Sequence, residues 1–240
     1  SEEEKRLTAF HEAGHAITHF FCETADPVHQ ISIIPRGMAG GYTMSLPEND
    51  KSFVTKTQME DQIVTLLGGR VAEKLVLDDI STGASNDLER ATAVARAMVT
   101  RYGFSERLGP VVYGGEPSET FLGRDLGAGR GYSENIASEI DSEIREMLDE
   151  AYETARTILT DHMEQLKVIA QALLEREKLS GEQFTVLMNG GTLPPEEIDD
   201  EVLPAAAEKA EEAAVKPADA AQTELQDAPD ALKVDEAEIK

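Results

Sequence analysis

The chain has 240 residues, of which 47 are acidic and 22 are basic, so its formal net charge at pH 7 is −25. Such a charge repels phosphate backbones and anionic membrane surfaces, and it argues against nucleic acid as a partner. The one cysteine, Cys22, excludes an internal disulfide and suits a reducing compartment. No apolar run approaches the length of a membrane span, which is about 18 residues. The N-terminal "SEEEKR" has the wrong charge for a signal peptide. We expect this end to be a cut end.

The first helix is predicted from about Glu4 to Glu23, because apolar residues recur there at spacings of three and four. Alternating apolar residues on both sides of Pro35-Arg36-Gly37 then predict a pair of strands. The residues that carry this alternation are Ile31, Ile33, Tyr42, Met44 and Leu46.

A second helix is predicted over roughly Thr55 to Val76, with Gly68-Gly69 in its interior. Each interior glycine costs about 1 kcal/mol relative to alanine, which is tolerable where another backbone must come very close. A third helix begins near "STGASNDLER", where Asn86 and Glu89 have the spacing of a capping pair. Residues 103–132 are glycine-rich and without periodicity, which is typical of a functional or mobile loop.

The helical pattern returns from Ser133 to about Lys178, with a break predicted near Thr160-Asp161. Ser180 and Gln183 predict the cap of a last short helix that stops at Asn189-Gly190-Gly191. The fold class is therefore mainly α with a small β-hairpin or sheet.

Beyond Pro194 the chain becomes acidic and has no aromatic residue. It cannot bury enough apolar surface to offset the entropy of ordering. We interpret residues 1–194 as one domain, cut short at its N-terminus, and residues 195–240 as a disordered acidic tail.

The histidines of "HEAGH" are four residues apart, so on a helix His11 and His15 share a face about 6 Å apart along the axis. Two imidazoles at this spacing can bind one zinc ion, which lowers the pKa of a coordinated water toward about 7. Glu12 is placed to accept the proton of that water and to pass it to a leaving amine. The alternative is a pair of half-buried histidines that are merely hydrogen-bonded.

A catalytic zinc needs a third protein ligand. His19 and Cys22 lie on the same helix too far along it to share one ion, and His29 and His162 stand alone and are more simply structural. Two carboxylates are left. Spacing alone does not decide between Glu73, which follows the glycine pair, and Asp87, which follows "STGAS".

Five motifs occur in a succession that resembles the peptidase module of the FtsH-type AAA+ metalloproteases: "HEAGHA", "VHQISIIPRGMAGGYT", "LLGGRVAEKLV", "STGASNDLERAT" and "YGFSERLGPVVYG". The resemblance covers about residues 4–190. It implies that His11, His15 and Asp87 hold one Zn²⁺ and that Glu12 is the base. It also implies that Glu73 lies behind the ligands and orients one of them.

The same resemblance implies features that these 240 residues do not contain. Relatives of this kind carry N-terminal transmembrane helices and an ATPase module, whereas no G-x-x-x-x-G-K-[ST] phosphate loop is present here. ATP would therefore act only in a missing module, and the membrane would be reached only through missing N-terminal segments. The implied assembly is a homo-hexamer on the cytoplasmic side of the inner membrane, degrading unfolded or misassembled proteins.

The segment Gly40 to Met44 is predicted to end as a strand with an open edge beside the metal. An unfolded polypeptide can add to such an edge through main-chain hydrogen bonds, which read no side chain. Gly41, Tyr42 and Thr43 are thus candidate substrate-binding residues. An ordinary hairpin far from the metal is the alternative.

Two other functions are compatible with the motif. One is a different H-E-x-x-H hydrolase, such as an aminopeptidase or a deformylase, although Cys22 cannot supply the cysteine ligand that deformylases use. The other is a non-enzymatic assembly module, whose structural zinc would have four protein ligands and no open position.

Overall fold

The computed structural model describes residues 1–37, 40–47, 52–114 and 131–195, and residues Ser1–Pro195 form one compact unit. The predicted mainly α fold with a small sheet is confirmed. The predicted acidic tail lies, apart from Pro195, outside the described residues, as does the 115–130 part of the glycine-rich segment. In the described ranges no helix is long and apolar enough to span a bilayer.

The two helices that matter most for the site have strong N-terminal caps. Helix α1 spans Glu2–Phe21 and starts two residues earlier than predicted, because Ser1 forms a capping box with Glu4. Helix α2 spans Lys56–Leu77, and Thr55 forms its capping box with Gln58. These caps satisfy backbone N–H groups that would otherwise have no partner.

The sheet has three antiparallel strands in the order β2-β1-β3. The predicted pair is confirmed as β1 (Val28–Ser32) and β2 (Tyr42–Ser45). Strand β3 (Lys178–Ser180) was not predicted, because three residues are too short to show an alternating pattern. It covers the side of β1 that faces away from β2.

Helix α3 spans Ser85–Thr100 and follows a 3₁₀ turn, η1, at Thr82–Ala84. The predicted cap by Asn86 is wrong: Ala84 is the N-cap of α3, and no side chain caps it. The Ser81 hydroxyl instead caps η1 by accepting from the N–H of Gly83. The 3₁₀ turn runs directly into α3, so Asn86 lies within the first helical turn.

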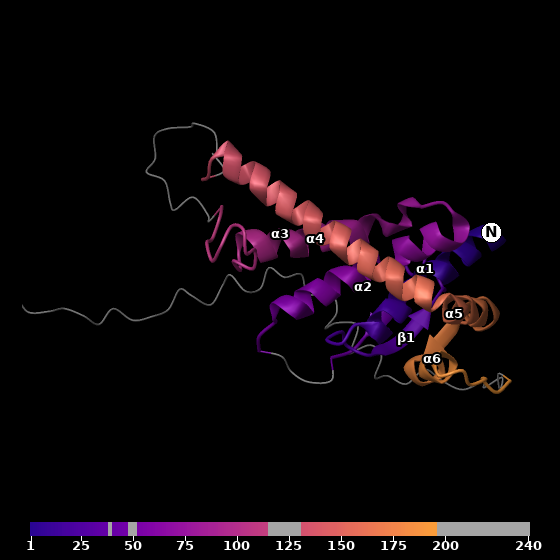
Figure 1. The fold of residues 1–240 in the computed structure, drawn as a ribbon. Helices are drawn as coiled ribbons and strands as arrows, with labels where there is room; N and C mark the ends of the chain where they lie inside the picture. The colour runs from indigo at the N-terminus through magenta and orange to yellow at the C-terminus, as the bar shows by residue number, and fades with distance from the viewer. Residues whose placement is uncertain (38–39, 48–51, 115–130, 196–240) are drawn as a thin grey trace, which may run out of the picture. The chain divides into compact units, whose positions relative to one another are not determined.

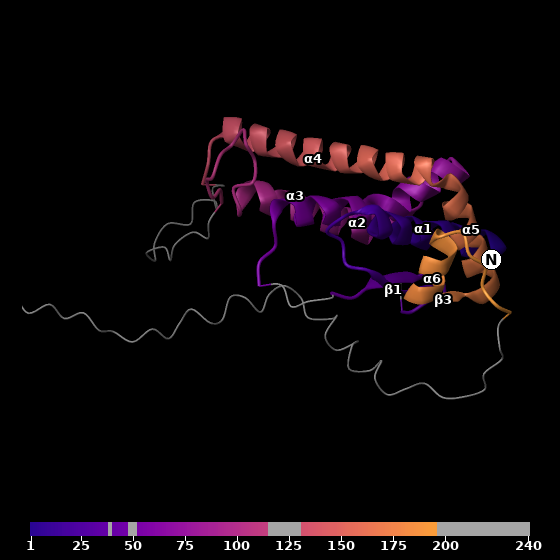
Figure 2. The same ribbon diagram turned by 60° about the horizontal axis from the view of Figure 1, so that its bottom comes forward.

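The C-terminal half is helical. Helices α4 (Glu134–Asp161) and α5 (Met163–Arg176) meet at His162, which confirms the predicted break, and a Ser180–Gln183 capping box begins α6 (Gly181–Met188) as predicted. Figures 1 and 2 show α4 lying along α2 and α3, while the sheet packs on another side of α1.

The backbones of α1 and α2 touch where both helices have glycine. A Cβ added to Gly14 would lie 2.4 Å from the carbonyl oxygen of Gly68, and one added to Gly68 would lie 2.7 Å from the carbonyl oxygen of Gly14. Real Cβ atoms do not tolerate such distances. The close backbone approach predicted from the interior glycines is therefore confirmed.

Candidate metal centre

His11 and His15 lie on one face of α1 and turn the same ring nitrogen toward each other. Their Nε2 atoms are 3.0 Å apart. The Nδ1 of His15 lies 2.8 Å from the carbonyl oxygen of Thr65, and the Nδ1 of His11 lies 2.6 Å from Oε1 of Glu73. A carbonyl and an ionised carboxylate only accept, so both Nδ1 atoms carry the hydrogen. In the neutral rings, both Nε2 lone pairs then point into the same space.

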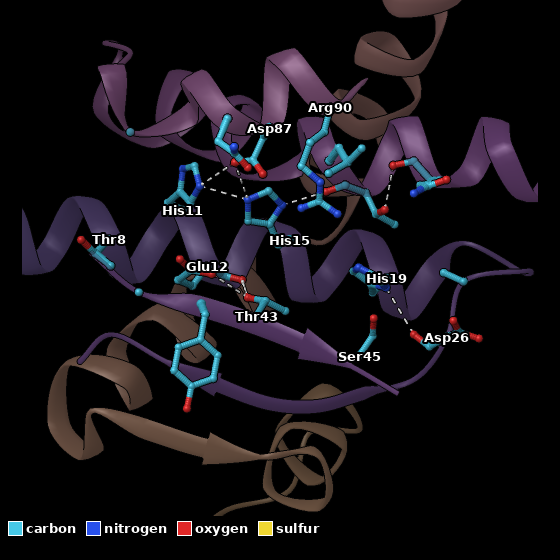
Figure 3. Close-up of a pocket in the computed structure, with 18 of the residues that line it drawn as sticks. Thr8, His11, Glu12, His15, His19, Asp26, Thr43, Ser45, Asp87 and Arg90 are labelled. Carbon is cyan, nitrogen blue, oxygen red and sulfur yellow. Dashed lines mark hydrogen bonds and ion pairs between the residues drawn. The ribbon is translucent and has the colours of Figure 1, made fainter. Parts of the chain in front are cut away.

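Asp87 completes the cluster from the first turn of α3. Its Oδ2 lies 3.4 Å from Nε2 of His11 and 3.4 Å from Nε2 of His15 (Figure 3). Nitrogen and oxygen ligands about 2.0–2.1 Å from a tetrahedral zinc stand about 3.3 Å apart. The three atoms form a triangle of nearly that size, and these residues are a group that could hold a metal ion. Two lone pairs and a carboxylate oxygen at such distances require a cation or a proton between them.

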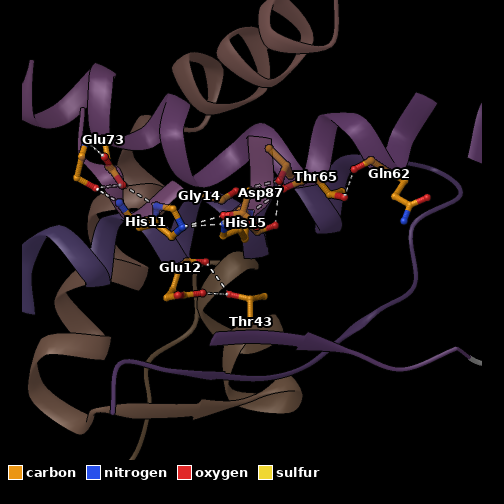
Figure 4. Close-up of polar contacts among 12 residues, drawn as sticks. His11, Glu12, Gly14, His15, Thr43, Gln62, Thr65, Glu73 and Asp87 are labelled. Atoms are coloured by element: carbon orange, nitrogen blue, oxygen red, sulfur yellow. Dashed lines mark hydrogen bonds and ion pairs between the residues drawn. The ribbon is translucent and has the colours of Figure 1, made fainter. Parts of the chain in front are cut away.

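Glu73 lies on the other side of His11 from this cluster, as Figure 4 shows. It is fully buried, and its carboxylate accepts from the N–H of Ser81 at 2.7 Å and from the Ser81 hydroxyl at 3.2 Å, in addition to His11. Ser81 caps the η1 turn that leads into Asp87. The buried Glu73 carboxylate therefore orients His11 and also anchors the turn that precedes Asp87.

The charges in the cluster perturb one another strongly. Burial would lower the pKa of His11, but its hydrogen bonds to Asp87 and Glu73 outweigh this and raise that pKa to about 9. Burial would raise the pKa of Asp87, yet the two imidazoles hold it well below its usual range. Hydrogen bonds from His11 and Ser81 likewise lower the pKa of Glu73 against its burial. The site is built to hold positive charge at the Nε2 atoms.

Gly69 of α2 forms the floor beneath the two imidazoles. A Cβ at this position would lie 2.6 Å from Cε1 of His11 and 2.6 Å from Nε2 of His15. A side chain on an α-helix leans toward the preceding turn, so the missing Cβ also leaves the carbonyl of Thr65 open to His15. The glycine pair predicted close helix packing, but nothing in its sequence pattern predicted that Gly69 makes room for the two imidazoles.

Glu12 points from α1 toward the sheet. Its Oε2 accepts a hydrogen bond of 2.8 Å from the Thr43 hydroxyl on β2, and the side chain is only 6 % exposed. Burial raises the pKa of Glu12, so its carboxylate takes up a proton more readily than an exposed one. The structure thus places β2 directly beside the motif, and the alternative of a remote hairpin is excluded.

A pocket of about 610 Å³ opens over these residues. Its lining includes Gly41, Tyr42 and Thr43 together with both motif histidines, Glu12 and Asp87. Arg90, one turn beyond Asp87, is the only lysine or arginine among the described lining residues.

The other candidate side chains are not part of the donor cluster. His19 lines the pocket, but its Nδ1 bonds the carbonyl oxygen of Asp26 at 3.2 Å. Cys22 is buried, and burial raises the pKa of its thiol to about 12. His162 stacks on Phe21 with ring centroids 3.8 Å apart. His29 borders a separate surface hollow beside Ser180.

Two histidines four residues apart, a third donor that is a carboxylate, and a neighbouring glutamate define an H-E-x-x-H metal site of the kind used by zinc peptidases. Comparison with known proteins agrees: the family model described as Peptidase family M41 matches residues 1–187. The chain belongs to Peptidase family M41, which confirms the resemblance seen in its five motifs.

Curated relatives of this chain are named as ATP-dependent zinc metalloproteases. The chain is 57 % identical over 190 residues to "ATP-dependent zinc metalloprotease FtsH 1" of Thermoanaerobacter sp. (strain X514), covering 79 % of this chain and 31 % of the relative. It is 57 % identical over 188 residues to the FtsH protein of Caldicellulosiruptor bescii, covering 78 % and 30 %. To that of Bacillus subtilis it is 46 % identical over 202 residues, covering 84 % and 32 %. The chain thus spans about a third of the length of these relatives.

The floor of the site gives a direct test. Gly69→Ala improves helix propensity by about 1 kcal/mol, but its methyl group overlaps both imidazoles. We expect the variant to keep its helical circular dichroism and to lose zinc in metal analysis after dialysis. Full zinc content at unchanged affinity would contradict this account of Gly69.

Gly68→Ala is the comparison variant, because it changes the helix contact and not the floor of the site. The atoms nearest to its methyl group belong to the Thr18 side chain and the Gly14 backbone, and none of them is an imidazole atom. Because this methyl group pushes α1 away from α2, which carries Thr65 and Glu73, we expect the thermal unfolding midpoint and the zinc affinity to fall together. Gly69→Ala should instead lose zinc without a comparable loss of stability.

Proposed function

We propose that this chain is a zinc-dependent endopeptidase domain in which His11, His15 and Asp87 hold one Zn²⁺ and Glu12 is the general base. The observation that carries the proposal is the triangle of donor atoms, 3.0, 3.4 and 3.4 Å on its sides, with the buried Glu12 carboxylate on the next residue. Three protein ligands leave a tetrahedral ion one open position, whereas a structural zinc has four protein ligands.

When bound, zinc acts as a Lewis acid that activates a water and polarises the scissile carbonyl. Glu12 then has two tasks. It accepts the proton of the attacking water on its carboxylate and later donates that proton to the leaving amine. In the neutral rings of His11 and His15, Nε2 is free of hydrogen because Glu73 and the Thr65 carbonyl hold the hydrogen on Nδ1.

Glu73 fits the role of orienting residue better than that of ligand. Both of its oxygens already accept hydrogen bonds, one from His11 and Ser81 and the other from the Ser81 N–H. Asp87, by contrast, faces the two Nε2 atoms. This geometry supports the assignment that the family resemblance implied and that spacing alone left open.

The second part of the proposal is that substrate adds to the free edge of β2. The direction of the backbone groups follows from β1. The N–H of Ile33 donates to the carbonyl of Glu177 at 2.9 Å, on the β3 side. Backbone groups alternate along a strand, so Ile31 also faces β3, while Gln30 and Ser32 face β2.

The partners of those two residues on β2 are Met44 and Tyr42, whose backbone groups therefore face β1. The N–H of Leu46 bonds in the same direction. Thr43 and Ser45, which alternate with them, turn their N–H and C=O outward. Both residues line the pocket. An extended polypeptide can pair with these groups next to the metal, without any requirement on its side chains.

The relatives are named as ATP-dependent zinc metalloproteases, which suggests a wider context for this domain. We propose that this domain belongs to a longer, ATP-dependent protease that acts on unfolded or misassembled proteins. In that protein, segments beyond this chain would provide the ATPase, the membrane anchor, the hexameric ring and a position at the cytoplasmic side of the inner membrane. Main-chain recognition supports this substrate class, because only unfolded chains offer extended backbone freely.

The proposed chemistry is tested with unfolded casein whose amino termini are blocked. We expect cleavage that a chelator abolishes and added zinc restores. Glu12→Gln should retain zinc while cleavage falls by about 10²–10⁴-fold, the range of general acid–base catalysis. Trimming of free N-termini alone would indicate an aminopeptidase, and full activity of Glu12→Gln would exclude the mechanism.

The assignment of the two carboxylates is tested by zinc content. Asp87→Asn removes a charged donor from the triangle and should lower zinc affinity by more than the about 10–100-fold expected for a change behind the ligands. Glu73→Gln should fall within that smaller range. The reverse order, measured by competition with a chromogenic chelator, would mean that the two roles are exchanged.

The free edge is tested at Ser45, because a change at Thr43 would also remove the hydroxyl that bonds Glu12. Ser45→Pro removes one outward N–H, and proline is tolerated on an edge strand. We expect KM for an end-blocked peptide to rise, with zinc content unchanged, whereas Ser45→Ala behaves like the parent chain. An unaltered KM in Ser45→Pro would place substrate elsewhere.

A further inference from the structure

Thr43 makes two different kinds of contact. Its backbone N–H and C=O face the free edge of β2, while its hydroxyl faces α1, 2.8 Å from Oε2 of Glu12 and 3.1 Å from the Glu12 carbonyl oxygen. Figure 4 shows the hydroxyl directed at the glutamate. The hydroxyl has a single proton to donate, and an ionised carboxylate is the stronger acceptor of the two.

Thr43 holds the Glu12 carboxylate at one of its two oxygens. Among the described residues, its Oε2 has Thr43 as a hydrogen-bond donor, and no described residue donates to Oε1. Glu12 lines the pocket together with His11, His15 and Asp87. One oxygen is thus anchored to the strand, and the other accepts no hydrogen bond from any described residue.

The residue that precedes β2 also supports the Glu12 side chain. A Cβ at Gly41 would lie 3.0 Å from Cγ of Glu12 and 2.8 Å from the methyl group of Thr8. Gly41, the residue before β2, therefore lies against Cγ of Glu12, and Thr43 on β2 bonds its carboxylate. A glutamate has three rotatable side-chain bonds, and these contacts restrict them.

From this geometry we infer that Thr43 is a positioning residue: it fixes the Glu12 carboxylate relative to the same strand on which the substrate backbone is aligned. The inference rests on the proposed function. Thr43 then positions both the substrate backbone and the base. A peptide bond that is aligned with β2 is therefore also aligned with Oε1 of Glu12.

An ordinary strand threonine would explain the hydrogen bond without any catalytic consequence. That alternative predicts a change in stability alone. The positioning role predicts a loss in kcat, because Thr43 acts through the base, and little change in KM, because its outward backbone groups are kept in any non-proline variant.

The experiment compares Thr43→Val, which has the same shape without the hydroxyl, with Thr43→Ser, which keeps it. The probe is an end-blocked fluorogenic peptide, and zinc content is measured in each sample. For Thr43→Val we expect kcat to fall on the order of 10–100-fold, as for loss of a hydrogen bond to a charged group, with KM within about threefold. Thr43→Ser should restore most of the rate.

Two further measurements separate positioning from general damage. In a Glu12→Gln background, Thr43→Val should cause no additional loss, because residues that act as one unit are not additive. A crystal structure of Thr43→Val should show the Glu12 carboxylate displaced or in more than one rotamer. Thr154→Val, which removes an exposed helical hydroxyl far along the chain, controls for the substitution type.

The inference is overturned if Thr43→Val keeps kcat within about twofold, if the whole effect appears in KM, or if the effects of Thr43→Val and Glu12→Gln multiply. An unmoved Glu12 in the variant crystal structure would also overturn it. A parent chain that shows no zinc-dependent cleavage overturns the proposed function itself, and that result is read before any Thr43 variant is measured.

Discussion

The near-contact between the backbones of α1 and α2 is the constraint on which the rest of the site depends. Gly14 and Gly68 bring the helices so close that no side chain fits between them. Only at this separation can the Thr65 carbonyl and Glu73, both on α2, reach the outer nitrogens of histidines on α1. Glu73 in turn binds Ser81 and so sets the start of α3, which carries Asp87. The donor cluster is therefore a product of helix packing.

The parts of this arrangement that follow a periodic pattern were predictable. Helix α2, the β1–β2 pair and the break at His162 were all evident in the spacing of apolar and turn-forming residues. Strand β3 and the start of α3 were not, because a three-residue strand has no period and a 3₁₀ turn supplied the cap that Asn86 was expected to make.

The site was predictable to a different degree. The histidine pair follows from local helical geometry, but the choice between Glu73 and Asp87 depends on how three helices pack, which no spacing encodes. The partner of His15 is a main-chain carbonyl, and every residue has one, so the sequence could not distinguish Thr65. The Thr43 hydroxyl was equally hidden, since only the register of β2 against α1 brings it to Glu12.

The shortness of β2 bears on how products leave. The strand has four residues, and two of them, Thr43 and Ser45, direct one N–H and one C=O each toward the pocket. A substrate that binds there as proposed would form few main-chain hydrogen bonds, each contributing about 0.5–1.5 kcal/mol net. Cleavage would divide those bonds between two fragments, so neither fragment would be held tightly. Under the proposed binding mode, product release would need no separate opening of the protein, because cleavage itself would weaken the binding of both fragments.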